Sequence, residues 1–215
     1  MKDEILQTSL KQFLKYGIRE MSIQKLVEPL GISTKTVYKY FKNKEELLEE
    51  ALHLHYAQQY QMLQKLSADQ KVVPLLLDIW YTAFEKEYKV TNTFFHDLNY
   101  YYPELERKIQ TAMSVKFTKQ FIEIVQKGMD EAVFQHTINP AVVLEGIYIL
   151  YDAAVRTERY KPFRVSPFDL LLNTIVVYIR GFCTAKGIEE LDEHIQTFQA
   201  FGKGKNAKEK VANPL

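Results

Sequence analysis

Apolar residues recur at helical spacing along almost the whole chain, and this pattern limits the fold more than any other feature. Leu6, Leu10 and Phe13 begin it on one face of the first segment, and the same spacing returns in nearly every later segment. Only 8 Gly and 7 Pro interrupt the 215 residues, which is too few for a β-sandwich rich in loops. We therefore expect an all-α protein of about nine or ten helices.

Capping residues mark where the helices near the amino terminus begin and end. Gly17 ends a first helix, and Ser22 and Ser33 each precede a short helix. The serine hydroxyl can accept a hydrogen bond from one of the first backbone amides of that helix, which have no partner within it. Asn43, with a glutamate three residues later, forms a variant of the capping box. A longer fourth helix is therefore predicted to begin directly after Asn43.

The spacing of these signals predicts two domains. Residues 1–50 form the first domain, and the fourth helix, 44–66, links it to the second. A polar stretch at 67–71 breaks the helical pattern, and longer helices then fill the second domain, 67–201. The last segment, 202–215, is polar and rich in lysine, so we expect a disordered tail.

Positive charge is concentrated on one short segment, although the chain as a whole is almost neutral. Its 28 Lys and Arg against 27 Asp and Glu give a net charge of +1, so the overall charge indicates no polyanionic partner. Between Ser33 and Lys44, however, there are four lysines and no acid. On a helix, one solvent-facing stripe would collect Lys35, Tyr38, Lys39 and Lys42. A basic helix face of this kind fits the major groove of DNA and its flanking phosphates.

Two short helices joined by the turn Leu30-Gly31-Ile32-Ser33 are predicted to form a helix-turn-helix. Neither helix is long enough to be stable alone, so their apolar residues must pack together. These residues are Ile23, Leu26, Val27, Leu30, Val37 and Phe41. A helical corner in any all-α protein would pack in the same way, and the basic stripe favours DNA binding over that alternative. Ser33, Thr34 and Thr36 add hydroxyl groups that can reach phosphates or base edges.

The segment YGIREMSIQKLVEPLGISTKTVYKYFKNKEELL, residues 16–48, resembles the DNA-binding domain of the TetR/AcrR family of transcriptional regulators. The two glycines, the Ser22 cap, the Val-Tyr-x-Tyr-Phe block and the start of the fourth helix match the family pattern without a gap. The resemblance implies that a third helix at about 34–40 enters the major groove. The residues it places on DNA there are Thr34, Lys35, Thr36, Tyr38 and Lys39, and it places Ser22 and Lys44 on backbone phosphates.

Lys44 adjoins the amides at the start of the fourth helix, where the helix dipole also attracts anions. A solvated lysine is the alternative for this residue.

Three other positions depart from the family pattern. Val27 replaces a small residue, and Pro29 is expected to tighten the last turn of the second helix by removing a hydrogen bond. Lys35 stands where glycine is common, so the operator sequence cannot be taken from relatives.

Beyond residue 50 only the number and length of the helices fit the family. The resemblance implies a homodimer on double-stranded operator DNA, with a second domain that binds a small effector. The abundance of aromatic residues suggests an apolar or aromatic effector, and ordinary core packing is the alternative. The predicted pocket comprises Trp80, Phe84, Phe95, His96, Tyr100, Phe117, Phe121, Tyr148 and Tyr151.

The family also implies dimerisation through its last two long helices, here about 140–158 and 166–184. A dimer would place two recognition helices one DNA turn, or a multiple of it, apart, which is selective enough for an operator. The predicted interface comprises Gly146, Leu150, Ala153, Ala154, Ile175, Ile179 and Phe182. Packing inside one protomer is the alternative for each of these residues.

Other classes of protein are excluded or rank low. The single cysteine, Cys183, rules out an internal disulfide and a cysteine-cluster zinc site, and we expect no metal or cofactor. No nucleotide-binding loop, hydrolase motif or convergent catalytic set is present, so we do not expect an enzyme; an all-α enzyme acting on a phosphorylated substrate ranks a distant third. The amino end lacks the apolar core of a signal peptide, and the apolar runs are too short to cross a bilayer, so we expect a cytoplasmic protein without membrane contact.

Two hypotheses therefore remain for function. The first is a sequence-specific DNA-binding transcriptional regulator, a repressor that a small molecule releases from DNA. The second keeps the DNA-binding domain but has a solid carboxy-terminal bundle that answers to a protein partner or to no ligand. An internal cavity of several hundred Å³ would favour the first hypothesis, and a filled core would favour the second.

Overall fold

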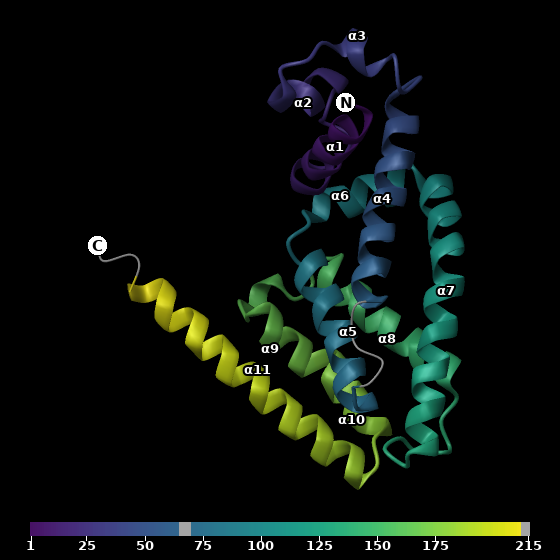
Figure 1. Cartoon of the computed structure of the whole chain (residues 1–215), viewed down its shortest axis with the longest axis vertical. Helices are drawn as coiled ribbons and strands as arrows, with labels where there is room; N and C mark the ends of the chain where they lie inside the picture. The colour runs from purple at the N-terminus through teal and green to yellow at the C-terminus, as the bar shows by residue number, and fades with distance from the viewer. Residues whose placement is uncertain (65–69, 212–215) are drawn as a thin grey trace.

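The computed structural model describes residues 1–64 and 70–211, and these residues form an all-α fold, as expected. Figure 1 shows the first three helices at one end of an elongated molecule, with the fourth running from that end into the body. The four helices are α1 (Lys2–Tyr16), α2 (Ile23–Val27), α3 (Thr34–Val37) and α4 (Lys44–Gln64).

Seven more helices, most of them long, form the rest of the described molecule, and α7 lies along one side of it (Figure 1). A π-helical turn, Leu172–Val176, joins two of these helices into one continuous rod. In chain order the helices are α5 (Val72–Glu87), α6 (Asn92–Tyr101), α7 (Pro103–Asp130), α8 (Pro140–Val155), α9 (Pro167–Leu171), α10 (Val177–Phe182) and α11 (Ala185–Val211).

The described residues pack into two hydrophobic cores. The carboxy-terminal core lies among α5, α7, α8, α9 and α10, with Trp80 and Phe134 among its fully buried side chains. The amino-terminal core lies among α1, α2, α3 and α4, but it also takes in Phe94, Leu98 and Ile109 from α6 and the start of α7. The predicted division at residues 67–71 therefore does not separate the two cores, because α6 packs against the amino-terminal helices.

The predicted helices end somewhat differently from the observed ones. Pro29 lies in a 3₁₀ turn, Glu28–Leu30, that follows α2, as its missing N–H predicted. The third helix is shorter than 34–40, because after Val37 the chain continues in single turns to Phe41. α4 is described to Gln64, and the end predicted at residue 66 lies outside the described residues.

The end of the chain also differs from the expectation of a disordered tail. α11 continues through the lysine-rich segment to Val211, since Lys, Ala and Glu all favour helix, while residues 212–215 lie outside the described residues. The first half of α11 packs along α5. His194 lies 2.8 Å from the Asp78 carboxylate, and the Phe198 and Tyr81 rings are 4.7 Å apart.

Gly17, between α1 and α2, has a backbone conformation that only glycine adopts readily. Its φ of 86° and ψ of −179° lie in a region that costs other residues about 1–3 kcal/mol. A Cβ at this position would also lie 2.8 Å from Thr93 Cγ2 on α6. The chain therefore passes close to α6 here, and glycine permits both the turn and the contact.

Gly17→Ala is expected to lower the free energy of unfolding by about 3 kcal/mol, because it combines backbone strain with a steric clash. Gly31→Ala is a matched control: Gly31 also has a positive φ, 62°, but nothing lies within 4 Å of an added Cβ. This control should lose only about 1 kcal/mol. Urea denaturation measures both, and equal losses would show that the contact with α6 contributes nothing.

Candidate nucleic-acid interface and ligand pocket

Serine side chains begin α2 and α3 as predicted. The Ser22 hydroxyl accepts a hydrogen bond from the Lys25 amide at 3.3 Å, and the Ser33 hydroxyl accepts one from the Thr36 amide at 3.3 Å. The Ser33 and Thr36 hydroxyls also lie 3.1 Å apart. These caps stabilise two very short helices, and both serines remain exposed.

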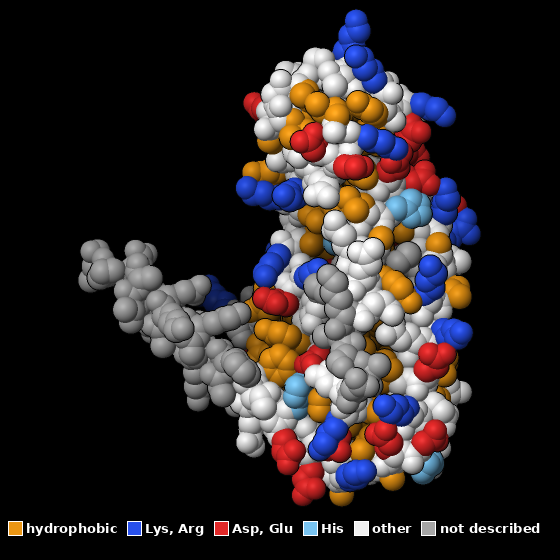
Figure 2. Space-filling model, viewed as in Figure 1, with side chains coloured by type: hydrophobic (Ala, Val, Ile, Leu, Met, Phe, Trp, Pro, Cys, Tyr) orange, Lys and Arg blue, Asp and Glu red, His pale blue; other side chains and the backbone are white. Residues whose placement is uncertain are grey.

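The predicted basic stripe lies on the outer surface of the helix-turn-helix. Lys35, Lys39 and Lys42 are exposed, and none of them forms an ion pair with any residue that the structure describes. Tyr38 is 55% exposed, whereas Val37 and Phe41 are buried beneath it. In Figure 2 basic side chains project from the end of the molecule that carries α3. This end therefore presents a basic face over α3 and the turns that follow it, with the Glu46 carboxylate at its edge, where it accepts a hydrogen bond from the Lys42 amide.

Lys44 does not extend from the surface as a free phosphate ligand would. Its ammonium group donates hydrogen bonds to the carbonyl of Ile18 at 2.6 Å and to that of Arg19 at 3.3 Å. Burial lowers the pKa of Lys44, and the nearby Asp97 and Glu20 carboxylates partly oppose that shift. Lys44 thus stabilises the segment between α1 and α2 by hydrogen bonds to its backbone carbonyls.

α6 holds the same segment from the other side. One carboxylate oxygen of Asp97 accepts hydrogen bonds from the amides of Ile18, at 2.8 Å, and Arg19, at 2.7 Å. The Arg19 guanidinium lies 4.9 Å from the ring centroid of Tyr101 and donates to its hydroxyl. The helix-turn-helix is therefore connected to the body of the molecule through the segment at residues 18–19.

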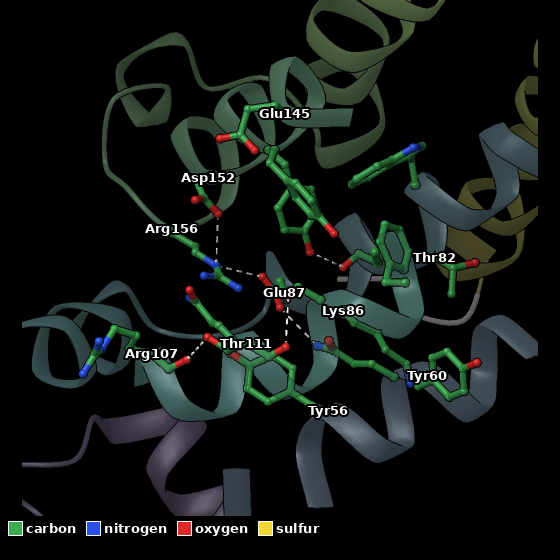
Figure 3. Close-up of a pocket in the computed structure, with 18 residues that line it drawn as sticks. Tyr56, Tyr60, Thr82, Lys86, Glu87, Arg107, Thr111, Glu145, Asp152 and Arg156 are labelled. Atoms are coloured by element: carbon green, nitrogen blue, oxygen red, sulfur yellow. Dashed lines mark hydrogen bonds and ion pairs between the residues drawn. The ribbon is translucent and has the colours of Figure 1, made fainter. Parts of the chain in front are cut away.

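A cavity of about 470 Å³ lies among α4, α5, α7 and α8. Aromatic and hydroxyl-bearing side chains make up much of its wall, and charged groups gather at one end, as Figure 3 shows. Its lining comprises Tyr56, Gln59, Tyr60, Trp80, Thr82, Ala83, Lys86, Glu87, Arg107, Gln110, Thr111, Ser114, Phe117, Glu145, Tyr148, Tyr151, Asp152 and Arg156.

Four of the nine residues predicted for the pocket line this cavity: Trp80, Phe117, Tyr148 and Tyr151. Two more stand behind its wall, since the rings of Phe84 and Tyr151 are 6.2 Å apart and those of Phe121 and Trp80 are 6.4 Å apart. The remaining three predicted residues lie on α6, which does not form part of the cavity wall.

The other three predicted residues lie on α6 and do not line the cavity. Phe95 is buried in the amino-terminal core, and His96 and Tyr100 stack on the exposed side of α6 with ring centroids 5.8 Å apart. α6 turns its apolar face to α1 instead, so the aromatic run in this region serves the amino-terminal core.

A buried ion pair stands at the charged end of the cavity. Glu87 is 2% exposed and accepts hydrogen bonds from Gln59 at 3.1 Å and from Arg156 at 3.3 Å. Burial disfavours its ionisation, but Arg156 and His55 outweigh burial, so the pKa of Glu87 lies below its ordinary value. Arg156 also lies 5.2 Å above the Phe95 ring. Arg156 therefore touches both the cavity and α6.

The sequence analysis missed several of these lining residues. Tyr56 and Tyr60 lie on α4, which had been assigned only a linking role, although the two are spaced to share a helix face. Glu87 and Arg156 are single charged residues near helix ends, and no local pattern distinguishes them from solvated ones. Their pairing, 69 residues apart in the chain, is a tertiary contact.

Most of the predicted dimer residues are covered within one protomer. Ala154, Ile175, Ile179 and Phe182 are each at most 4% exposed, so they offer no surface to a partner. Gly146 lies against the Tyr178 ring, and Leu150 and Ala153 are half-buried. The exposed apolar residues on the same helices are Val142 and Ile149 on α8, each 64% exposed, and Val177 on α10, 59% exposed.

The fold and the basic helix-turn-helix together define a DNA-binding protein of the helix-turn-helix class. Residues 5–51 match the model of the bacterial regulatory proteins of the tetR family. The amino-terminal part of the chain is thus a DNA-binding domain of the tetR type, and the solved structures below show the fold of the rest. No curated protein sequence matches the chain significantly.

Solved structures share the fold over most of the chain. Reduced NemR from E. coli aligns with a TM-score of 0.70 at 17% identity, covering 85% of this chain and 96% of that one. A TetR-family regulator from Cytophaga hutchinsonii aligns with a TM-score of 0.68 at 16% identity, covering 85% and 94%. The fatty acid degradation regulator FadR from Bacillus halodurans gives 0.64 at 16%, covering 80% and 89%. In the described parts of the chain, no helix is both long and apolar enough to span a membrane.

Proposed function

We propose that this regulator is a cytoplasmic repressor that binds its operator as a homodimer and leaves it when a small molecule occupies the cavity. The observation that carries the proposal is the cavity of about 470 Å³ among α4, α5, α7 and α8, which is large enough for a small organic ligand. A regulator that answers to a protein partner or to no ligand would need no such space.

For DNA recognition we propose that α3 enters the major groove. Thr34, Lys35, Tyr38 and Lys39 then reach base edges or phosphates, with Thr36 as a further hydroxyl, and Lys42 and the exposed Ser22 and Ser33 reach the backbone. Lys44 acts indirectly in this proposal, because its ammonium group already binds two carbonyl oxygens.

For dimerisation we propose that α8 and α10 of two protomers pack together. The exposed apolar residues Val142, Ile149 and Val177 support this choice, because surfaces of this kind are usually covered by a partner. Ile175 in the π-helical turn and Ile179 and Phe182 on α10 then support the interface from within, by packing this rod onto its own protomer.

The contacts of Arg156 suggest how ligand binding could reach the DNA-binding surface. Arg156 lines the cavity and lies against Phe95 on α6, and Asp97, two residues further along α6, holds the amides of Ile18 and Arg19. A ligand that moves Arg156 would therefore shift α6 and with it the segment that positions the helix-turn-helix. The small molecule and the operator DNA would then favour different positions of α6, which is what coupling between two binding sites requires.

Selection of bound fragments from random duplex DNA would identify the operator and test the first half of the proposal. Lys35→Ala is then expected to cost about 1–3 kcal/mol of operator affinity and to relax sequence preference at one position of each half-site. Lys11→Ala, an exposed lysine on α1, is the matched control and should preserve that preference. A loss that is uniform over all sequences would show that Lys35 contacts phosphate only.

A further inference from the structure

Aromatic rings form one wall of the cavity. Trp80 lies at the centre of this wall, with ring centroids 5.7 Å from Phe117, 6.0 Å from Tyr148 and 5.6 Å from Tyr151. Tyr56 and Tyr60 lie on the other side of the cavity from Glu145 in Figure 3. The faces of such rings carry partial negative charge and attract cations.

Negative charge exceeds positive charge at the end of the cavity where Arg156 lies. Its guanidinium is 3.3 Å from the Glu87 carboxylate, 3.4 Å from that of Asp152 and 3.9 Å from that of Glu106. Figure 3 shows it between Asp152 and Glu87. Burial lowers the pKa of the neighbouring His55, and the Glu87 carboxylate opposes that shift. Three carboxylates thus lie close to one guanidinium, and burial raises the pKa of two of them, Glu106 and Asp152.

Glu145 adds a further carboxylate to the same wall. It lies three residues before Tyr148 and seven before Asp152 on α8, so the three side chains share one helix face. Glu145 forms no ion pair with any residue among 1–64 and 70–198. Burial raises the pKa of the Tyr148 hydroxyl, and Glu145 and Asp152 raise it further while Arg156 opposes them. The Tyr148 ring thus shares the cavity wall with the Glu145 and Asp152 carboxylates.

The other two cations that line the cavity do not reverse this balance. Arg107 is exposed and pairs with Glu104, so its charge is already matched. Lys86 is exposed to water, where its charge is screened, and the exposed Glu145 is screened in the same way. The lining itself holds three carboxylates (Glu87, Glu145 and Asp152) and three cations (Lys86, Arg107 and Arg156). Two further carboxylates outside the lining, Glu104 and Glu106, pair with Arg107 and Arg156, so that carboxylates outnumber cations once these partners are included. An anionic ligand would meet net repulsion.

We propose that this cavity, which we have taken above as the effector site, binds an organic cation. The ligand class is a quaternary ammonium ion or protonated amine carried on an aromatic or branched alkyl body. Its body packs against Trp80 and Phe117, and its charge lies by the Tyr148 ring, near the carboxylates of Glu145 and Asp152.

Trp80 supplies the readout, because it is the only tryptophan in the chain and lines the cavity. The full chain is titrated with phenyltrimethylammonium, with its neutral isostere tert-butylbenzene and with the anion 4-tert-butylbenzoate, and Trp80 fluorescence is recorded. The cation is expected to bind at least about tenfold more tightly than either of the others, which corresponds to about 1.4 kcal/mol.

Glu145→Gln is the decisive variant, because Glu145 is exposed and its replacement leaves no buried group without a partner. We expect it to weaken cation binding about three- to tenfold and to leave binding of tert-butylbenzene unchanged. Asp152→Asn should act in the same direction. Glu193→Gln, an exposed carboxylate on α11 that does not line the cavity, is the control and should change neither affinity.

The proposal is overturned if the neutral or anionic compound binds as tightly as the cation, if Glu145→Gln leaves cation affinity unchanged, or if the cation does not alter Trp80 fluorescence. Release of the selected operator is followed separately in the same titrations. If tert-butylbenzene or the anion releases DNA, the cation assignment fails while control by a small molecule stands. If no compound binds and the operator complex persists, both ligand assignments fail and only DNA binding remains.

Discussion

Glu87→Gln is expected to lower the free energy of unfolding by about 3 kcal/mol, because it removes the carboxylate of a buried ion pair while keeping its volume. The Arg156 guanidinium would lose its closest partner, at 3.3 Å, and retain Asp152 and Glu106 at 3.4 and 3.9 Å. Because these two carboxylates remain, the decrease in the free energy of unfolding should lie near the lower end of the range for breaking a buried ion pair. Urea denaturation monitored by circular dichroism measures it.

Glu85→Gln is the matched control on the same helix. Glu85 pairs with Lys89 at 3.2 Å, but both side chains are at least half exposed, so its loss should stay within about 0.5 kcal/mol. In the double variant Glu87→Gln, Arg156→Met the buried guanidinium is removed together with its closest partner, and Glu106 keeps its hydrogen bond from Gln110. The double variant should therefore lose less stability than the sum of the single losses. Equal effects for Glu85→Gln and Glu87→Gln would show that the buried pair contributes no more than a surface pair.

Asp97→Ala is expected to destabilise the chain by about 2–4 kcal/mol and to weaken operator binding. The reason is that two amide donors, those of Ile18 and Arg19, lose their shared acceptor, and each unsatisfied buried donor costs about 1–3 kcal/mol. Lys44, which binds the carbonyls of the same two residues, would also lose a nearby opposite charge. Denaturation and operator titration of the same preparation measure both effects.

Asp97→Asn retains one carbonyl oxygen that can accept both hydrogen bonds, so its loss should be smaller than that of Asp97→Ala. Asn99→Ala, at an exposed position on the same helix, is the control and should stay within about 0.5 kcal/mol of the natural chain. If Asp97→Ala destabilises the protein but leaves operator affinity unchanged, the segment at residues 18–19 does not position the helix-turn-helix.

The all-α fold and the helix-turn-helix could be predicted because their signals are local. Ser22 and Ser33 cap the helices that follow them by hydrogen bonds to amides three residues away. The same reasoning placed Val37 and Phe41 inside and the lysines outside, since position on a short helix decides which side faces the core. Lys44 followed no such rule, because its partners lie 25 and 26 residues earlier in the chain.

The ligand pocket could be predicted only in part, because helical spacing identifies an apolar face but not what covers it. Trp80 and Tyr148 face the cavity, whereas the equally aromatic Phe95 faces the amino-terminal core. For Ile175 and Ile179, helical spacing likewise did not show whether a second protomer or the same protomer covers them. Both are fully buried in their own protomer. Only the packing of distant helices distinguishes these cases.

The amino-terminal core has a consequence for attempts to recombine this regulator with its relatives. Phe94, Leu98 and Ile109 belong to that core although they come after α5 in the chain. A chimera that joins residues 1–64 to a foreign ligand-binding half would leave the apolar surfaces of α1 and α4 facing an unmatched helix. The unit that must be exchanged is therefore discontinuous in sequence. A functional chimera has to transfer α6 together with the helix-turn-helix.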